Sequence, residues 1–340
     1  KAYKDISKMI SFDKKNKNFI SHPENGMYLP LFENKSLKEL LKKYKKKDIA
    51  AATQKRLEDI VVNYINTINK KSFKIALAGG VFSNVKLNQK IQELSKIKNI
   101  FVFPNMGDGG LSVGACALCH NHFKKLKSKK LKEYYLGFDY SKNEILREIN
   151  SYKLKYKTNK NIHSTIAKKL NQGNIISIFQ GKSEFGPRSL GNRSILARAI
   201  DPKINNLLNK KLGRTEFMPF APITLDIQSK KMYLNFNKGA NAAKYMTTTF
   251  NCTNAMKKKS PAAVHIDGTA RPQILYKNQN PVLYDILLKY FKISKIPNLI
   301  NTSFNMHEEP IVCNPKDAIR TFIRSKTDYL FIGKFLIKKK

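Results

Sequence analysis

The feature that most constrains the fold is a pair of short apolar segments, each followed by a glycine-rich loop and a helical pattern. FKIALA at 73–78 is predicted to be a buried strand that leads through two glycines into an amphipathic helix, which Asn84 can cap. NIFVFP at 99–104 is predicted to be a second strand, leading through NMGDGG into a helix from about Leu111. Two such steps in succession predict a mainly parallel sheet covered by helices, and therefore an α/β fold.

Helical spacing of apolar residues also predicts a long amphipathic helix over 49–68. A lysine-rich segment from about Phe123 to Lys132 interrupts the hydrophobic pattern and is typical of a linker, so we divide the chain into domains at 1–132 and 133–340. The second domain is also predicted to mix helices and strands. Its expected elements are a helix at 162–173 that Gly173 can end, a strand at 174–180, helices starting at Asp201-Pro202 and Asn314-Pro315, and strands at 245–252, 298–304 and 329–337.

The chain carries a formal net charge of +40, which attracts polyanions such as nucleic acid, phosphorylated substrates or an anionic membrane surface. The basic residues are spread in runs such as LKKYKKKD and MKKKS, without the regular aromatic residues of a base-stacking platform. We therefore expect a generally lysine-rich surface and at most non-specific binding of nucleic acid. Because there is no apolar run of about 18 residues and no signal-peptide pattern, we expect no membrane association and a cytoplasmic location.

The four cysteines are too few and too unevenly placed for a disulfide framework, so we expect reduced thiols. Cys116-Ala-Leu-Cys119-His120 matches the short haem-attachment signature, and His122 would extend it to a zinc site. The pattern lies in the apolar segment LSVGACALCHNHF, with no second cysteine pair nearby. Burial of a packed helix is therefore the expected explanation, since free cysteine usually behaves as a small hydrophobic residue.

The strongest local signal for chemistry is the loop GKSEFGPRSLGNRS, which places Lys182, Arg188 and Arg193 beside Glu184. Three cations between two apolar strands are costly unless an anion or a carboxylate balances them. Arginine suits phosphate because its planar guanidinium binds two oxygens at once. The alternative is a solvated basic loop.

Further polar clusters follow at the ends of predicted strands. They comprise Arg214 in GRTEFMPFAP, then His265, Asp267 and Arg271 in HIDGTARPQ, and Asn301, Ser303 and Asn305 in NTSFNMHEEP. Each has a structural alternative, because Asp267 can cap a turn and the asparagines can satisfy backbone groups. Their recurrence in one domain favours a shared substrate pocket.

The loops LAGGVFSN and NMGDGG form a second candidate site. Loops that follow parallel strands meet at one edge of the sheet, where glycines and helix N-termini expose N–H groups to phosphate oxygens. Asp108 would then project into a ligand cleft. Glycine pairs are also common in ordinary turns, so these loops alone are weak evidence.

Six sequence blocks in this order resemble one enzyme family: LAGGVFSN, NMGDGG, GKSEFGPRSLGNRSIL, FMPFAP, HIDGTARPQ and NTSFNMHEEPIV. The chain is identified as a member of the O-carbamoyltransferases of the NodU/CmcH type, which act on Nod factors, cephalosporins and aminoglycosides. The resemblance implies an α/β protein in which part of an actin-like, Kae1-type domain precedes a YrdC-like α/β domain. It also implies that the second domain makes carbamoyl adenylate from carbamoyl phosphate and ATP, and that the first transfers the carbamoyl group to an acceptor hydroxyl.

The resemblance also implies roles for individual residues. Lys182, Arg188, Arg193 and Arg214 would bind carbamoyl phosphate or nucleotide phosphates, Ser303 and Asn305 match the Ser-x-Asn element of YrdC proteins, and Gly79, Gly80 and Asn84 would contact nucleotide. Activation joins two polyanions, so its catalysis should rest on positioning and on neutralisation of phosphate charge by fixed cations. For transfer, the family implies a divalent metal, Fe(II) by resemblance, with Asp108 as the matching carboxylate ligand.

One departure from the family is the absence of its metal-binding His-x-x-x-His pair from this sequence. Either about half of the enzyme lies outside the chain, or a separate chain supplies it. Two other functions stay open. Kae1 and YrdC relatives together make threonylcarbamoyl-adenosine in tRNA, and the chain could instead be an inactive remnant that binds phosphate or nucleic acid.

Overall fold

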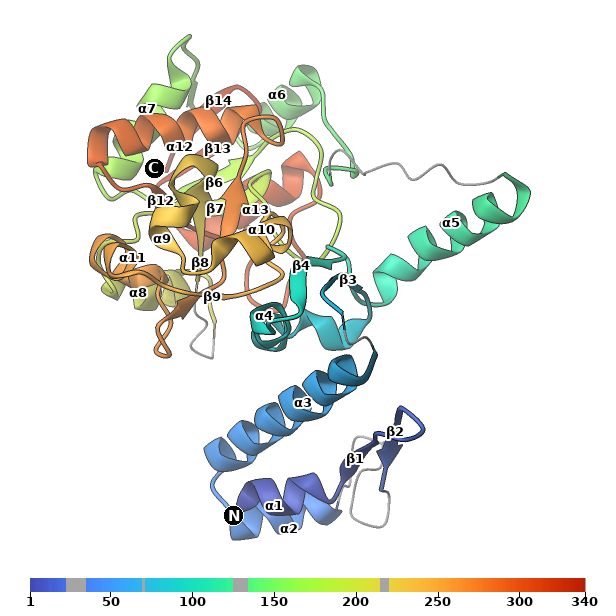
Figure 1. The fold of residues 1–340 in the computed structure, drawn as a ribbon. Coiled ribbons are helices and arrows are strands. Elements are labelled where there is room, and N and C mark those ends of the chain that lie inside the picture. The colour runs from blue at the N-terminus through green and yellow to red at the C-terminus, as the bar shows by residue number, and fades with distance from the viewer. Residues whose placement is uncertain (23–34, 69–70, 125–133, 215–219, 340) are drawn as a thin grey trace. The chain divides into compact units, whose positions relative to one another are not determined.

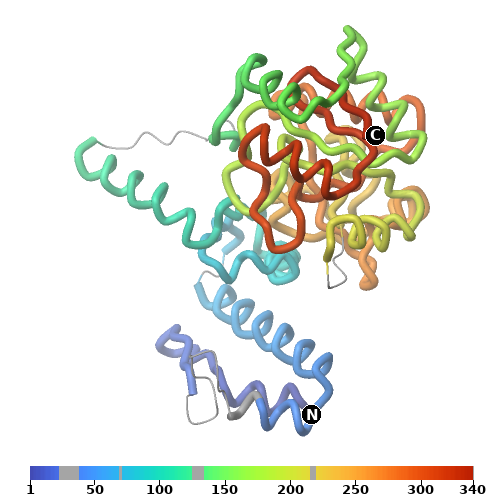
Figure 2. Tube along the Cα trace, turned by 180° about the vertical axis from the view of Figure 1, so that it is seen from behind, coloured from blue at the N-terminus to red at the C-terminus, as the bar shows by residue number. Residues whose placement is uncertain are grey.

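The structure is a computed structural model that describes residues 1–22, 35–68, 71–124, 134–214 and 220–339 (Figures 1 and 2). It divides into two compact units, one formed by 1–75 with 86–99 and the other by 76–85 with 100–340. Most of the predicted linker at 123–132 lies outside the described residues. The two units are described separately below.

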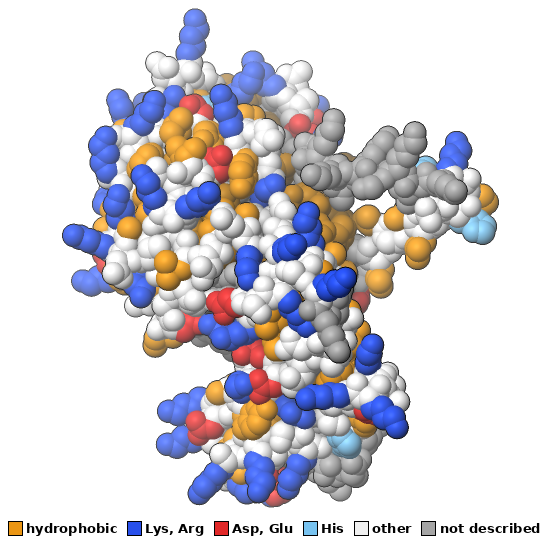
Figure 3. Space-filling model, viewed as in Figure 1, with side chains coloured by type: hydrophobic (Ala, Val, Ile, Leu, Met, Phe, Trp, Pro, Cys, Tyr) orange, Lys and Arg blue, Asp and Glu red, His pale blue; other side chains and the backbone are white. Residues whose placement is uncertain are grey.

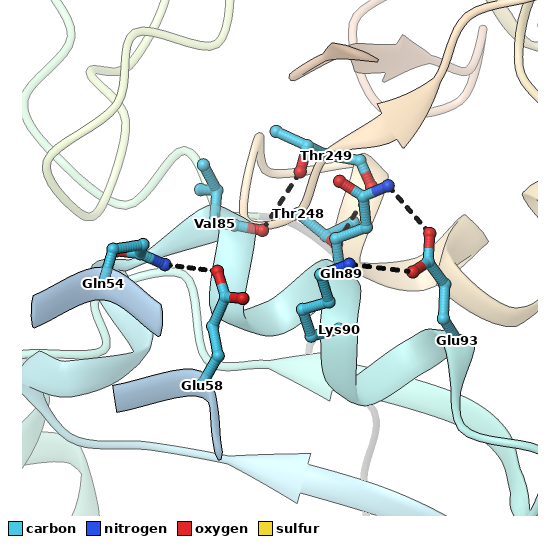
Figure 4. Close-up of polar contacts among 8 residues, drawn as sticks. All are labelled: Gln54, Glu58, Val85, Gln89, Lys90, Glu93, Thr248 and Thr249. Carbon is cyan, nitrogen blue, oxygen red and sulfur yellow. Dashed lines mark hydrogen bonds and ion pairs between the residues drawn. The ribbon is translucent and has the colours of Figure 1, made fainter. Parts of the chain in front are cut away.

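The first unit is mainly helical. It contains α1 (Ala2–Ser7), the antiparallel pair β1 (Ile10–Asp13) and β2 (Asn18–Ser21), α2 (Lys35–Lys43), α3 (Lys46–Ile68) and most of α4 (Val85–Glu93). The helix expected over 49–68 is confirmed as α3, whose Ile49 and Ala52 pack with Ile6 and Leu40 in a small core. Bonds between side chains four residues apart add local support, from Gln54 to Glu58 in α3 and from Gln89 to Glu93 in α4 (Figure 4).

Both strands predicted in the first half are present, as β3 (Phe73–Leu77) and β4 (Ile97–Val102), which pair with each other. The expectation that the first is fully buried is wrong, because exposed and less exposed residues alternate along β3. One face of that strand therefore stays accessible. The helix expected after it is confirmed as α4, with Leu87 and Ile91 fully buried.

The apolar helix expected from about Leu111 is present as α5 (Leu111–Phe123), but the prediction that it is buried is wrong. None of its residues is buried, Leu118 is 75% exposed, and Cys116 and Cys119 are both accessible. Its apolar residues lie all around the helix, a pattern that usually signals burial. The described residues of the chain supply no surface that covers it.

The second unit is built on an eight-stranded mixed sheet. In spatial order the strands are β11 (Gln273–Leu275), β8 (Ala221–Leu225), β12 (Asn298–Ser303), β7 (Arg193–Ala197), β6 (Ile176–Phe179), β13 (Tyr329–Ile332), β14 (Phe335–Lys338) and β5 (Tyr156–Lys157). Only the pairs β11–β8 and β13–β6 are parallel among the described pairs of this sheet. The predicted α/β fold class is confirmed.

Helices cover both faces of this sheet (Figure 1). Side chains alternate along each strand, so Leu196 of β7 faces one hydrophobic cluster while its neighbours Ile195 and Ala197 face the other. The first cluster includes α7 (Ile162–Asn171) and α12 (Pro281–Ser294). The second includes α6 (Lys142–Ser151), α8 (Lys203–Lys211), α9 (Ser229–Met232), α10 (Phe236–Ala243), α11 (Asn254–Lys259) and α13 (Pro315–Ser325).

Local sequence signals set most element ends in this unit. Gly173 has φ +91° directly after α7, and Asn314 accepts the N–H of Asp317 to cap α13. The strand expected over 245–252 is largely absent, because only Phe250–Asn251 forms β9, which pairs with β10 (Thr269–Ala270). Three successive threonines favour a strand locally, but here they lie buried in a loop whose hydroxyls bond to backbone carbonyls, as Thr247 does to Ala242.

The surface of the molecule is strongly basic. Lys and Arg side chains are spread over the visible face of the structure, with neutral and hydrophobic side chains between them (Figure 3). No helix within the described ranges is long and apolar enough to cross a membrane.

Arg193, the first residue of β7, fixes the loop between β6 and β7 to the sheet. It is completely buried, and its guanidinium lies 3.8 Å from the centre of the Phe179 ring. Its N–H groups donate to the backbone carbonyls of Gln180 (2.7 Å), Gly181 (3.0 Å), Asn192 (3.1 Å) and Phe138 (3.3 Å). These contacts are those of a structural side chain that fixes the backbone around it.

We predict that Arg193→Met lowers the free energy of unfolding by about 3 kcal/mol, since it leaves several buried carbonyls without a donor. The measurement is urea unfolding followed by circular dichroism. Arg147→Ala, which removes an exposed arginine from α6, is the control and should change stability by less than about 0.5 kcal/mol. Equal, small effects of both substitutions would contradict the structural role of Arg193.

Candidate functional site

A small cavity of about 110 Å³ lies at one edge of the eight-stranded sheet. Ala221, the first residue of β8, and Asn301 in β12 pair with each other, and both line the cavity. Around it lie Arg188 and Ser189 from the loop before β7, Arg214 after α8, Arg271 before β11, and Thr302 and Ser303 at the end of β12. Segments from four separate parts of the second unit therefore meet at one point.

Among the residues that the structure describes, the cavity is lined by three arginines and by no aspartate or glutamate. Arg214 donates to the Thr302 hydroxyl at 3.1 Å and lies over the Phe220 ring, with 5.0 Å from its central carbon to the ring centre. The Nε of Arg188 is buried and has no hydrogen-bond partner within the described part of the chain. No carboxylate among the described lining residues balances these positive charges.

Burial lowers the pKa of all three guanidiniums from their usual values. The effect is largest for Arg271, where burial and, second, the positive charge of Arg188 lower the pKa to about 9. The lowered pKa means that the positive charge is unfavourable in this cavity when no anion is bound. A bound anion would remove much of that unfavourable energy, so the cavity has the electrostatics of an anion site.

Glu184, in the same loop as Arg188, is engaged elsewhere. Its Oε1 accepts the backbone N–H groups of Leu190 and Asn192 at 2.8 Å and of Arg193 at 3.2 Å. These bonds shape the loop that carries Arg188, so the carboxylate acts on the backbone of the loop. Its negative charge also raises the pKa of Arg193, against the larger effect of burial.

Gly186 brings the same loop against the loop NMGDGG. Its φ of +119° is unfavourable for other residues, and an added Cβ would lie 2.9 Å from the Pro104 carbonyl oxygen. Phe185 and Phe103 meet edge to face beside it, with ring centres 6.1 Å apart. The glycine therefore permits a close approach of two backbones that set the position of Arg188.

Of the residues predicted from the sequence, the cavity brings together Arg188, Arg214, Arg271, Asn301 and Ser303. Lys182 is exposed and Arg193 is buried, and both lie outside the cavity lining. Asp267 accepts hydrogen bonds from the N–H and the hydroxyl of Thr269, and so caps a turn, as the structural alternative for this residue expected. His265 lies in the same turn. Asn305 donates to the carbonyls of Met306 and Glu309, and so closes its own loop.

The residues predicted in the first glycine-rich loops also lie outside this cavity. Gly79 has φ +114° and donates its N–H to the Met106 carbonyl at 2.7 Å, which ties the two loops together. Gly80 opens a short 3₁₀ turn, and Asn84 directly precedes α4. These positions are compatible with the predicted nucleotide contacts, which stay a prediction.

The described residues do not fit a divalent metal. Asp108 is exposed at the start of a short 3₁₀ turn, and the described ranges hold no group of three histidine, cysteine, aspartate or glutamate side chains placed to bind one ion. A single carboxylate is not a sufficient ligand set.

Sequence reasoning missed six residues of the cavity lining: Pro187, Ser189, Phe220, Ala221, Met246 and Thr302. Ser189 directly follows Arg188, and Thr302 lies between two residues that were predicted. Alternation along β12 would place Thr302 on the face opposite to its neighbours, so only the structure reveals its bond to Arg214. Phe220 gave no signal beyond its apolar character.

Comparison with known families gives matches over most of the chain. A family model described as "Carbamoyltransferase C-terminus" matches residues 167–339, and one described as "Carbamoyltransferase N-terminus" matches residues 12–117. An uncharacterised protein of Methanocaldococcus jannaschii is 39% identical over 89% of this chain and 51% of its own length. Nodulation protein NolO of Bradyrhizobium diazoefficiens is 33% identical over 86% of this chain and 55% of its own length.

The chain thus spans about half the length of these curated relatives. Among solved structures, full-length HypF in its phosphate- and nucleotide-bound form is 18% identical, with a TM-score of 0.37 over 51% of this chain and 25% of that one. The sequence blocks that resemble carbamoyltransferases fall within the two family matches, and the resemblance is confirmed. The chain belongs to the carbamoyltransferase family.

Proposed function

We propose that the chain carries the activation site of an O-carbamoyltransferase that uses carbamoyl phosphate and ATP to modify a hydroxyl of a small-molecule or glycan acceptor. Family membership supports the general activity, carbamoyl transfer. The observation that carries the specific proposal is the cavity in which Arg188, Arg214 and Arg271 converge, with no carboxylate among its described lining residues. In this proposal it holds the phosphate group of carbamoyl phosphate.

The size of the cavity agrees with this ligand. A buried water molecule needs a cavity volume of roughly 10–15 Å³. This cavity has a volume of about 110 Å³, which is enough for a phosphate-sized group. A whole nucleotide would have to extend beyond it. Three guanidiniums supply fixed donors to the phosphate oxygens, and the hydroxyls of Ser189, Thr302 and Ser303 lie among them.

The chemistry asked of these residues is positioning and charge neutralisation. Release of pyrophosphate requires an oxygen nucleophile that attacks the α-phosphorus of ATP, and carbamate is that nucleophile. Water must therefore first cleave carbamoyl phosphate into carbamate and phosphate, after which carbamate displaces pyrophosphate and forms carbamoyl adenylate. Both steps bring anions together, and the fixed guanidiniums lower the cost of their approach.

The transfer step is not assigned to residues of this chain. The family implies a metal there, and the described residues do not supply its ligands. Gly79, Gly80, Asn84 and Lys182 stay as predicted nucleotide contacts beyond the cavity. In this proposal the whole reaction also uses the part of the relatives that this chain does not span, as a covalent segment or a separate chain.

We predict opposite effects of Arg188→Met on stability and on anion binding. Without ligand, removing one of two half-buried guanidiniums that repel each other should raise the free energy of unfolding by up to roughly 1 kcal/mol. Affinity for carbamoyl phosphate should fall by about one to two decades, because a charge-assisted hydrogen bond contributes about 1.5–3 kcal/mol. Thermal unfolding with increasing carbamoyl phosphate measures both quantities.

Lys230→Ala is the matched control, since it removes one positive charge from an exposed position on α9. It should leave the ligand-induced rise in Tm unchanged. If Arg188→Met binds carbamoyl phosphate as tightly as the wild type, or if the control loses binding equally, the cavity is not the anion site.

We further predict that this chain alone releases pyrophosphate from ATP only when carbamoyl phosphate is present. Carbamoylated acceptor should not accumulate, because the described residues supply no ligand set for the metal that the family implies for transfer. Pyrophosphate and carbamoylated product are measured separately, with and without the missing region of a relative added as a second polypeptide. Pyrophosphate release that never depends on carbamoyl phosphate in a folded chain would contradict the proposed activation, and transfer at full rate without the added region would contradict the division of labour.

A further inference from the structure

We propose that Asn301 selects carbamoyl phosphate over other acyl phosphates by accepting a hydrogen bond from the carbamoyl amino group. This inference rests on the proposed function and concerns the same cavity. Asn301 is 2% exposed and lies in β12, where it pairs with Ala221 of β8. It is therefore held by a rigid part of the sheet.

The orientation of the Asn301 amide follows from a chain of hydrogen bonds. The Leu190 carbonyl can only accept, so the side chain of Gln273 donates to it through Nε2, at 2.7 Å. The Oε1 of Gln273 then faces Asn301 and accepts from its Nδ2, also at 2.7 Å. The same Nδ2 donates to the Ser189 carbonyl at 3.1 Å. Both N–H groups of Asn301 are thus occupied, and a flipped amide would place oxygen against oxygen.

This arrangement leaves the Asn301 Oδ1 as a buried acceptor with no partner within the described part of the chain. Such an atom is costly unless a ligand pairs with it. The arginines that line the same cavity are donors only, and they suit phosphate oxygens. Phosphate oxygens have no hydrogen for a carbonyl to accept when fully ionised. The unpaired Oδ1 therefore indicates that the ligand carries a second group, and that this group has an N–H.

Carbamoyl phosphate has this combination, because an amino group is separated from its phosphate by one carbonyl carbon. Acetyl phosphate is nearly the same size, but it has a methyl group in place of the amino group. Binding acetyl phosphate would bury the Asn301 Oδ1 against a methyl group with no hydrogen bond. A site with such an acceptor discriminates through the cost of leaving it unpaired.

The first test needs no substitution. Kd values of the wild-type chain for carbamoyl phosphate, acetyl phosphate and inorganic phosphate are measured by competition under one set of conditions. We expect carbamoyl phosphate to bind about ten-fold to one-hundred-fold more tightly than acetyl phosphate. Equal affinities for the two acyl phosphates would overturn the inference.

Two substitutions then test the residues. Asn301→Leu keeps the size of the side chain and should reduce the preference for carbamoyl phosphate to less than about three-fold, with affinity for inorganic phosphate nearly retained. Gln273→Met leaves Asn301 in place but removes the bond that fixes its amide, so the preference should fall part of the way. A preference that survives in both variants would contradict the role of Asn301. The preference is the ratio of the Kd values for acetyl phosphate and carbamoyl phosphate in one preparation, so it can be measured even when a variant is only partly folded.

Asn205→Leu is the matched control. Asn205 in α8 also has a bonded Nδ2, to the Ala262 carbonyl, and a buried Oδ1 without a partner among the described residues, but it lies outside the cavity. Its substitution should leave the preference unchanged, and a loss equal to that of Asn301→Leu would count against the inference. Failure of the proposed function looks different, because then none of the three phosphates would bind in a manner that depends on Arg188.

Discussion

The candidate site depends on positive charge in a small cavity whose described lining holds no carboxylate. Arg188, Arg214 and Arg271 are held close to one another, and the lowered pKa of Arg271 shows that this arrangement is unfavourable without an anion. The packed sheet supplies the stability that keeps them there, since the strands beside the cavity are buried on both faces. Glu184 bonds to backbone N–H groups, so its carboxylate leaves the guanidiniums available for a ligand.

Two arginines of this region differ in their surroundings although they are close in the sequence. Arg193 donates to four backbone carbonyls and stacks on Phe179, so its hydrogen-bonding capacity is largely used within the protein. Arg188, five positions earlier, lines the cavity. The Nε of each arginine is buried without a partner in the described residues, so the difference lies in the terminal N–H groups of Arg193, which donate to the backbone. Sequence spacing alone cannot separate these positions, because Arg188 lies in the loop between β6 and β7 whereas Arg193 is the first residue of β7.

Much of the fold was predictable because local signals and tertiary packing agree. Gly173 and Asn314 mark helix ends, and α3, β4 and β12 follow their apolar patterns. Prediction failed for α5, where apolar character indicated burial but could not show what covers the helix. It failed again over 245–252, where threonines with strand propensity satisfy their hydroxyls within a buried loop. The antiparallel pairs of the large sheet depend on contacts far apart in sequence.

The candidate site was partly predictable for a related reason. Residue type was enough to predict Arg188, Arg214 and Arg271 as site residues, and these three line the cavity. The bond that orients Asn301 comes from Gln273, whose importance depends on strand order. The most direct test of the account is a crystal structure of the chain with inorganic phosphate. We expect phosphate in contact with at least two of the three cavity guanidiniums. Phosphate bound elsewhere with this cavity empty, or arginines turned away from the cavity, would contradict the account.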